Sequence, residues 1–272
     1  MTMRRGYADG PFGQVHYQAA PEGRPLVLLH QAIMQSAQFD AVFAPLIARG
    51  LRPVAIDMPG FGMSDAPPHE PTIADYASAV MPVLDALGID DAVFAGHHTG
   101  ALVATECALA HPERVTAVVL AGPMIITEDE RQAGFDQLVS KERAFVAKPG
   151  GAHFPQIAAI REMLAEGTIG PDRISEYVIQ AMQAYHRGAY HYGHNAAFTY
   201  RHEPRMCALR QPTLLLTNTG DMTHPYALAA RALRPDFAWA EIAGGGIDIC
   251  DQEPQAWADA IADFIDGLPP RP

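Results

Sequence analysis

Short apolar runs alternate with segments of helical periodicity along the first half of the chain. This alternation is typical of a parallel sheet whose strands are joined by covering helices. Thr72 can cap the helix expected at residues 72–87, and Gly88 can end it. The strand-like runs are residues 15–19, 25–30, 52–57, 92–96 and 115–121, and the helical segments between them are residues 39–49, 72–87 and 99–110.

The pattern changes after Gly122. Residues 127–203 have helical periodicity, are richer in aromatic residues and histidine, and contain no strand-like run. Strand-like runs return at residues 212–217 and 238–243, before a final amphipathic helix at residues 254–265. The predicted fold class is therefore α/β: a mostly parallel central sheet flanked by helices, with a helical cap inserted between two strands. We expect residues 1–123 and 211–272 to form the core domain and residues 124–210 the cap.

Composition and charge narrow the class of partner. The 272 residues are 49% hydrophobic and 18% charged, which indicates a globular chain rather than a disordered one. The net charge of −12 argues against nucleic acid and anionic membranes, because both select clustered Lys and Arg. No apolar stretch approaches the roughly 20 residues that cross a bilayer. We expect a cytoplasmic protein with a small-molecule substrate, and a homodimer is left open. The cysteines are widely scattered and lack CxxC spacing: Cys107, Cys207 and Cys250.

The sequence Gly96-His97-His98-Thr99-Gly100 lies between a predicted strand and a predicted helix. In such a context, two glycines four residues apart permit a very tight turn, where larger side chains would clash with the helix and the neighbouring strand. The central residue of the turn projects above the sheet in a strained backbone conformation. In this chain that residue is a histidine, His98.

Three further segments carry recognisable motifs in a fixed order. They are His30-Gln-Ala, Asp57-Met-Pro-Gly-Phe-Gly-Met-Ser-Asp65 and the strand-and-turn segment 212–221, which ends in Asp221. With the turn around His98, they resemble the motifs of the α/β-hydrolase superfamily over nearly the whole chain. The resemblance implies the α/β-hydrolase fold, with His98 in the nucleophile elbow where the superfamily normally has serine.

The same resemblance implies roles for individual residues. The backbone N–H groups of Ala32 and Thr99 correspond to the two donors of the oxyanion hole, and Asp221 corresponds to the acidic member of the catalytic triad. His30 belongs to the oxyanion turn and is expected to hold it by a hydrogen bond. Pocket residues expected on the core side are His30, Met34 and Phe61.

Two members of the usual triad are missing. No serine lies in the elbow or in the helix behind it; the serines are Ser36, Ser64, Ser78, Ser140 and Ser175. Ile247 takes the position of the superfamily's catalytic histidine, and no histidine follows His224. Acyl transfer by a Ser-His-Asp triad is therefore excluded.

An imidazole at the elbow reaches farther than a serine hydroxyl, and so could approach Asp221. A carboxylate that holds one ring nitrogen raises the basicity of the other. We therefore expect a His98–Asp221 general base, with nucleophilic attack by His98 as the second choice. The substrate class would be a small organic ester, lactone or carbonyl compound, and hydrolysis is favoured. A cofactor-free C–C lyase or decarboxylase, and a non-catalytic ligand-binding protein, are the alternatives.

Other residues near the vacant histidine position are weaker candidates. Ile247 and Asp248 are candidate lining residues, and Asp248 is the fallback partner of His98. Cys250 has no evident base to form a thiolate. His97, in the first variable position of the elbow, is expected to pack structurally.

Residues 185–202 of the predicted cap combine aromatic residues with four histidines. Their spacing matches no compact metal motif and no carboxylate is interleaved, so neither a metal nor a cofactor is predicted. These side chains could form a wall that contacts a polar or aromatic ligand, or they could simply pack the cap onto the core. The sequence supports the two explanations equally. The candidates for ligand contact are Tyr190, His191, Tyr192 and His194.

Overall fold

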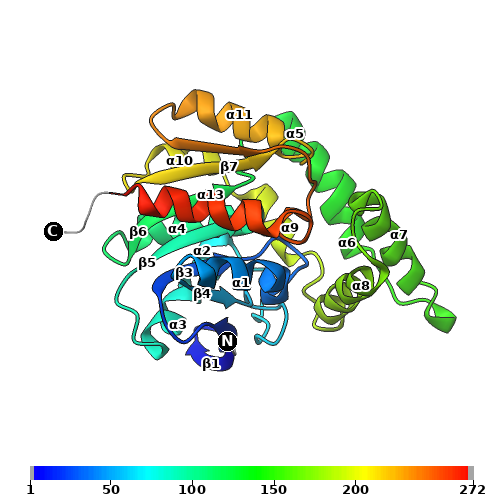
Figure 1. Ribbon diagram of the computed structural model, residues 1–272. Helices are drawn as coiled ribbons and strands as arrows, with labels where there is room; N and C mark the ends of the chain where they lie inside the picture. Colours follow the sequence, from blue (N-terminus) through cyan, green and yellow to red (C-terminus); the bar gives the residue numbers. More distant parts are fainter. Residues whose placement is uncertain (1–2, 269–272) are drawn as a thin grey trace.

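The computed structural model describes residues 3–268, and its strands form one twisted sheet in the order β1-β2-β4-β3-β5-β6-β7-β8 (Figure 1). Strands β3 to β8 are parallel to one another, whereas β1 and β2 form an antiparallel hairpin at one edge. The predicted fold class is therefore confirmed. The strands are β1 (Arg4–Gly10), β2 (Gly13–Ala19), β3 (Arg24–Leu29), β4 (Leu51–Ile56), β5 (Ala92–His97), β6 (Val115–Ala121), β7 (Thr213–Asn218) and β8 (Ala238–Ile242).

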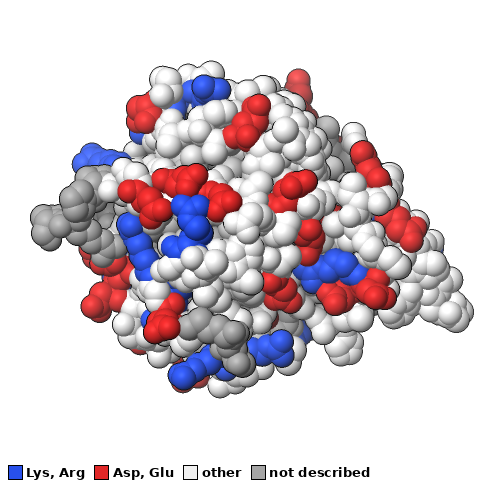
Figure 2. Space-filling model, viewed as in Figure 1, with Lys and Arg blue, Asp and Glu red and all other residues white. Residues whose placement is uncertain are grey.

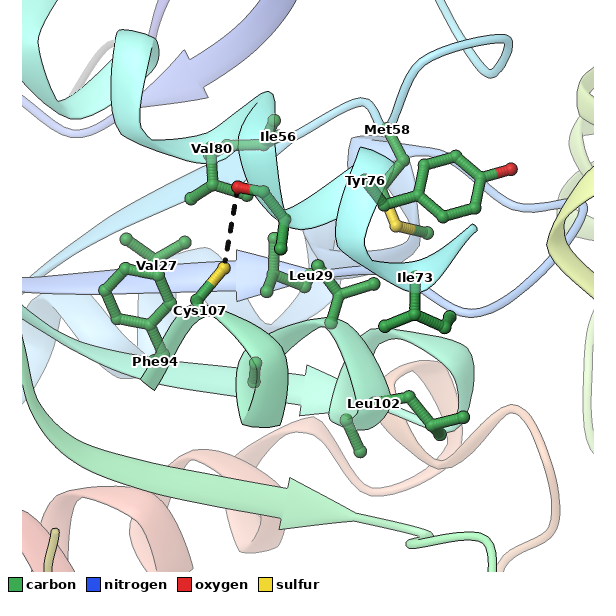
Figure 3. Close-up of a cluster of buried hydrophobic side chains, with 14 of the residues drawn as sticks. Val27, Leu29, Ile56, Met58, Ile73, Tyr76, Val80, Phe94, Leu102 and Cys107 are labelled. Carbon is green, nitrogen blue, oxygen red and sulfur yellow. Dashed lines mark hydrogen bonds between the residues drawn. The ribbon is translucent and has the colours of Figure 1, made fainter. Parts of the chain in front are cut away.

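Helices cover both faces of the sheet, because successive side chains of each buried strand point to opposite faces. In β5, Phe94 joins the core beneath α2, α3 and α4, while Val93 and Ala95 join the core beneath α1, α12 and α13. Figure 3 shows the first of these cores, in which Phe94 and Cys107 pack among aliphatic side chains. The helices outside the cap segment are α1 (Asp40–Ala48), α2 (Ile73–Ser78), α3 (Val80–Ala86), α4 (Thr99–Ala110), α11 (His224–Leu233), α12 (Ile249–Gln252) and α13 (Pro254–Asp266).

The chain between β6 and β7 is helical, and we call residues 124–210 the cap segment. Both predicted domain boundaries fall in loops, since β6 ends at Ala121 and β7 begins at Thr213. Helices α6, α7 and α8 extend to one side of the sheet, and α9 lies between them and the sheet (Figure 1). The regular elements of the cap segment are α5 (Glu128–Gly134), the π-helical η2 (Phe135–Val139), α6 (Ser140–Arg143), the 3-10 turn η3 (Pro149–Gly151), α7 (Phe154–Ala165), α8 (Pro171–His186), α9 (Tyr192–Thr199) and α10 (His202–Cys207).

Two elements differ from the sequence prediction. Strand β1 was not predicted; it lies at the sheet edge, where most of its side chains are exposed and its apolar pattern is weak. The segment predicted as one helix, 72–87, is divided into α2 and α3 at Ala79. Pro82 explains the break, because it has no N–H to continue the hydrogen-bond ladder. Thr72 caps α2 as expected, in a reciprocal capping box with Asp75.

The face shown in Figure 2 carries no single dominant charged patch. Acidic side chains are spread over the face shown in Figure 2, several of them beside Lys or Arg. Arg49, for example, pairs with Asp259, Asp263 and Asp266. No helix within residues 3–268 combines the length and hydropathy that a bilayer crossing requires.

Candidate active site

His98 occupies the sharp turn between β5 and α4. Its backbone angles, φ 48° and ψ −111°, are those of a strained non-glycine residue. A Cβ on Gly96 would lie 2.0 Å from the carbonyl oxygen of Gly100, and one on Gly100 would lie 1.9 Å from that of Leu29. The tight turn therefore requires both glycines, as predicted. The N–H of His98 donates to the carbonyl of Ala121 at 2.7 Å, which ties the elbow to β6.

The structure brings His98 and Asp221 together. Nε2 of His98 lies 2.7 Å from Oδ2 of Asp221, and the other carboxylate oxygen accepts hydrogen bonds from the backbone N–H and hydroxyl of Thr223 at 2.7 and 2.9 Å. Burial alone would raise the pKa of Asp221, but the charge and hydrogen bond of His98, with the Thr223 amide, hold that pKa well below its usual range. Because Asp221 is a carboxylate, it accepts a proton carried by Nε2. Nδ1 of neutral His98 is then an unprotonated base.

The imidazole of His98 fits because the residue after β6 is a glycine. Gly122 has φ +69°, and a Cβ there would lie 2.4 Å from Cδ2 and 2.9 Å from Nε2 of His98. The histidine side chain remains 13% exposed. Ile247, expected in the position of the superfamily histidine, is only partly buried.

Two backbone N–H groups have no acceptor within residues 3–268: that of Ala32 and that of Thr99, the residue after His98. Thr99 is the first residue of α4, where the helix dipole favours negative charge. Ala32 lies in a turn closed by the bond from Met34 N–H to the Gln31 carbonyl, 3.2 Å. Ile33 in this turn has φ 69°, a strained value for a β-branched residue. Both donors thus flank strained backbone, which is common at functional sites.

His97 is buried beneath His98, and their ring centroids are 4.3 Å apart. The N–H of Gln31 donates to Oε1 of Gln38 at 3.0 Å, which orients the amide so that its Nε2 donates to Nδ1 of His97 at 2.5 Å. The proton of neutral His97 is therefore on its Nε2. Burial lowers the pKa of His97 to about 3, so the ring stays neutral.

A metal ion is the alternative use of this cluster. One ring nitrogen from each of His97 and His98 and one oxygen of Asp221 lie within 4.8 Å of one another. A metal needs an unprotonated nitrogen from each histidine. In His97, Nδ1 accepts from Gln38 and Nε2 carries the proton, so no free lone pair is offered. The hydrogen bonds therefore favour proton transfer over metal binding.

The buried histidines predict a loss of stability in mild acid. Burial lowers the pKa of both His97 and His202 to about 3, whereas the unfolded chain binds protons at these residues near the ordinary value of 6.5. The free energy of unfolding should therefore fall as the pH drops from about 6.5 towards 3, by about 1.4 kcal/mol per pH unit for each histidine, and should not depend on them at higher pH.

Urea unfolding at several pH values measures this slope. His202→Gln should reduce it by one histidine's share, whereas the same change at the exposed His186 should leave it unaltered. Equal slopes in wild type and His202→Gln would contradict the assignment.

Three residues expected to line the pocket from the core side are packed instead. His30 is fully buried: its Nε2 accepts from the N–H of Met58 at 2.9 Å, and its Nδ1 pairs with the carbonyl of Gln31 at 2.8 Å. Both ring nitrogens of His30 therefore bind backbone groups, one of them in the turn that carries Ala32. Phe61 is also fully buried, edge-on to His30, and Met34 packs beneath α8.

Asp248 forms an ion pair with an arginine rather than with His98. Its carboxylate pairs with Arg161 of α7, whose guanidinium lies 4.3 Å from the ring centroid of Tyr177. Because Asp221 contacts His98, the fallback role of Asp248 is not needed, and Asp248 joins core and cap segment instead. Burial raises the pKa of Cys250 well above its ordinary value, which removes that thiol as a nucleophile.

The candidates in the cap segment divide into two groups. His191 links the segment to the core, because its Nε2 lies 2.8 Å from Oε1 of Glu70, a residue outside the segment; its expected contact with a ligand stays a prediction. The neighbouring Tyr192 packs edge-on to His191, with ring centroids 5.0 Å apart. His194 and Tyr190 both lie near Glu142: Nδ1 of His194 is 2.8 Å from that carboxylate, and its charge acts on Tyr190.

Some site residues carry only weak sequence signals. Thr223 forms an Asx turn with Asp221, and an Asp followed two residues later by Thr is a usable local signal. Gly122, after a strand, could have suggested a close approach. Gln38 meets His97, and Arg161 meets Asp248, only in the folded chain.

A strand-turn-helix elbow with an acid from a later strand defines an α/β-hydrolase architecture. The chain belongs to the alpha/beta hydrolase fold family, whose profile matches residues 24–245. The structure resembles a hydrolase from Pseudomonas aeruginosa PA01 (TM-score 0.80, 20% identity, 97% of this chain and 99% of that one). It also resembles epoxide hydrolase A from Mycobacterium thermoresistibile (TM-score 0.77, 20% identity, 99% and 100%).

Curated relatives match over shorter segments. A putative non-heme haloperoxidase of Mycobacterium phage D29 is 36% identical over 98 residues, 36% of this chain and 35% of the relative. A 2-hydroxy-6-oxo-6-phenylhexa-2,4-dienoate hydrolase of Burkholderia cepacia is 34% identical over 114 residues, 40% of each chain. The bifunctional epoxide hydrolase 2 of Mus musculus is 34% identical over 110 residues, 39% of this chain and 19% of the relative. The chain spans two fifths or less of these relatives.

Proposed function

We propose that this chain is a hydrolase of small organic esters, lactones or carbonyl compounds that uses His98 as a general base. The observation that carries the proposal is the 2.7 Å contact between Nε2 of His98 and Asp221, which leaves Nδ1 as the basic nitrogen. Relatives named as dienoate and epoxide hydrolases support hydrolysis of a small organic substrate.

In this mechanism water is the nucleophile. Nδ1 of His98 accepts a proton from water while the water oxygen attacks the carbonyl carbon, and Asp221 stabilises the imidazolium that forms. The N–H groups of Ala32 and Thr99 donate to the oxyanion of the tetrahedral intermediate, a contribution of about 10²–10³-fold per donor in comparable sites. The intermediate then collapses and releases the leaving group.

No covalent intermediate on serine or cysteine is part of this mechanism. The elbow has histidine in place of serine, and Cys107 and Cys250 are both buried. An acyl-imidazole on His98 is the one covalent alternative, and it would use the same Nδ1. The two routes differ in whether the protein carries an acyl group during turnover.

Mass spectrometry of the intact protein tests the mechanism. Wild type is expected to hydrolyse 4-nitrophenyl acetate, to gain no acetyl group during turnover, and to form no adduct with a fluorophosphonate probe, because that probe requires an activated serine.

A fluorophosphonate adduct, or an acetyl group on a side chain that forms and decays at the rate of turnover, would overturn general-base hydrolysis. A small lactone or ester that raises the melting temperature and is recovered unchanged, in a protein without esterase activity, would instead favour the ligand-binding alternative.

A further inference from the structure

A second carboxylate–histidine pair lies in the cap segment. Nδ1 of His194, on α9, is 2.8 Å from Oε1 of Glu142, on α6. The side chain of Glu142 is 6% exposed, and its other oxygen is buried with no partner. His194 is 24% exposed, and no group within residues 3–268 bonds its Nε2. The pair therefore has the same form as His98–Asp221: a buried acid holds one ring nitrogen and leaves the other available.

The backbone that carries His194 lies against the oxyanion turn. Gly193 precedes it, and a Cβ on Gly193 would be 2.8 Å from Cβ and 3.1 Å from Cα of Ala32. Ala32 supplies one of the two unpaired N–H groups described above. Tyr190, which is buried close by, has its pKa raised by burial and then by the charge of Glu142. The second pair is thus carried by the part of the cap segment that packs against the Ala32 turn.

We infer that His194 is a second acid–base group of this site, which gives a proton to the leaving group, and that Glu142 positions its ring. The inference rests on the proposed function, because it names the donor of the proton that the leaving group receives. General-base hydrolysis by His98 does not specify that donor. A poor leaving group such as an alkoxide needs that proton as its bond breaks.

The protons balance in two steps. First, water loses a proton to Nδ1 of His98 while its oxygen bonds to the carbonyl carbon. Then the bond from that carbon to the leaving oxygen breaks, its electron pair stays on the leaving oxygen, and protonated His194 gives the proton from Nε2 to that oxygen. The products are a carboxylic acid and an alcohol. His98 returns its proton to solvent, and His194 takes one up.

The cap segment offers a matched control. His191 also pairs with a glutamate at 2.8 Å, but Glu70 is 42% exposed and also binds Arg143 at 2.5 Å. That pair anchors the cap segment at its rim. His191→Gln therefore disturbs a histidine–glutamate contact in the same segment without removing the proposed acid.

The test compares two acetate esters with different leaving groups. His194→Gln is expected to lower kcat/KM for benzyl acetate by about 10²–10⁴-fold, and to change that for 4-nitrophenyl acetate by less than about threefold, because nitrophenolate leaves without a proton. Glu142→Gln should show the same selectivity in weaker form. His191→Gln should affect both esters alike.

Equal losses on both esters in His194→Gln, or no loss on benzyl acetate, would overturn the role of His194. The result is separable from the proposed function, because His98→Ala must lower kcat/KM for both esters. Should His194→Gln unfold, His194→Ala at low temperature with added imidazole provides the second measurement. Rescue restricted to benzyl acetate supports an acid role, and absence of rescue contradicts it.

Discussion

His98→Ala is expected to lower kcat/KM for small esters by about 10²–10⁴-fold, because it removes the base that Asp221 holds at the elbow. The backbone should tolerate the change. Alanine is smaller than histidine at a position with φ 48°, and the glycines that permit the turn are untouched. The measurement is the steady-state rate on 4-nitrophenyl acetate, with thermal unfolding to confirm that the fold is retained.

His98→Ser is the matched contrast. A serine at the elbow would lack its usual histidine, since no histidine follows His224 in the sequence. His98→Ser should therefore be as inactive as His98→Ala and should not react with a fluorophosphonate probe. Wild-type activity in His98→Ala, or serine-hydrolase activity in His98→Ser, would show that the elbow histidine is not the base.

Asp221→Asn is expected to have an effect of similar size for a different reason. The amide oxygen can still accept from the N–H of Thr223, so the local turn should persist. The amide nitrogen then faces Nε2 of His98 and donates to it, which moves the ring proton to Nδ1, the atom that must accept a proton. A carboxylate-to-amide change of this kind costs about 10⁴-fold in a catalytic triad.

The rate on 4-nitrophenyl acetate measures this effect too. Asp136→Asn, a change in an exposed part of the cap segment, should retain full activity. A loss of less than about tenfold in Asp221→Asn would mean that the tautomer of His98 does not control the reaction.

The elbow and its acid can be predicted from the sequence because their signals are local. Two glycines four residues apart between a strand and a helix predict the turn at His98. Asp221 follows a buried strand whose carboxyl end meets the same edge of the sheet. The parallel strands are similarly clear, since both of their faces are buried and they form continuous apolar runs.

The remaining site residues depend on contacts between distant segments. Whether Asp248 faces a ligand or an arginine depends on how α7 lies over the sheet, and its partner Arg161 is 87 residues away along the chain. Burial lowers the pKa of both His30 and His97. Their bonded ring nitrogens meet a carbonyl, an N–H or an amide, and two of these partners, Met58 and Gln38, come from distant segments. The periodicity of a local segment does not predict such pairings.

The tautomer of His98 tests the central claim most directly. In the ¹⁵N NMR spectrum of histidine-labelled wild type, with the signals of His98 assigned by their loss in His98→Ala, the neutral ring should carry its proton on Nε2 and none on Nδ1. That result is predicted by the hydrogen bond to the Asp221 carboxylate. A proton on Nδ1 with an unprotonated Nε2 would contradict it, because the nitrogen proposed as the base would then be a donor.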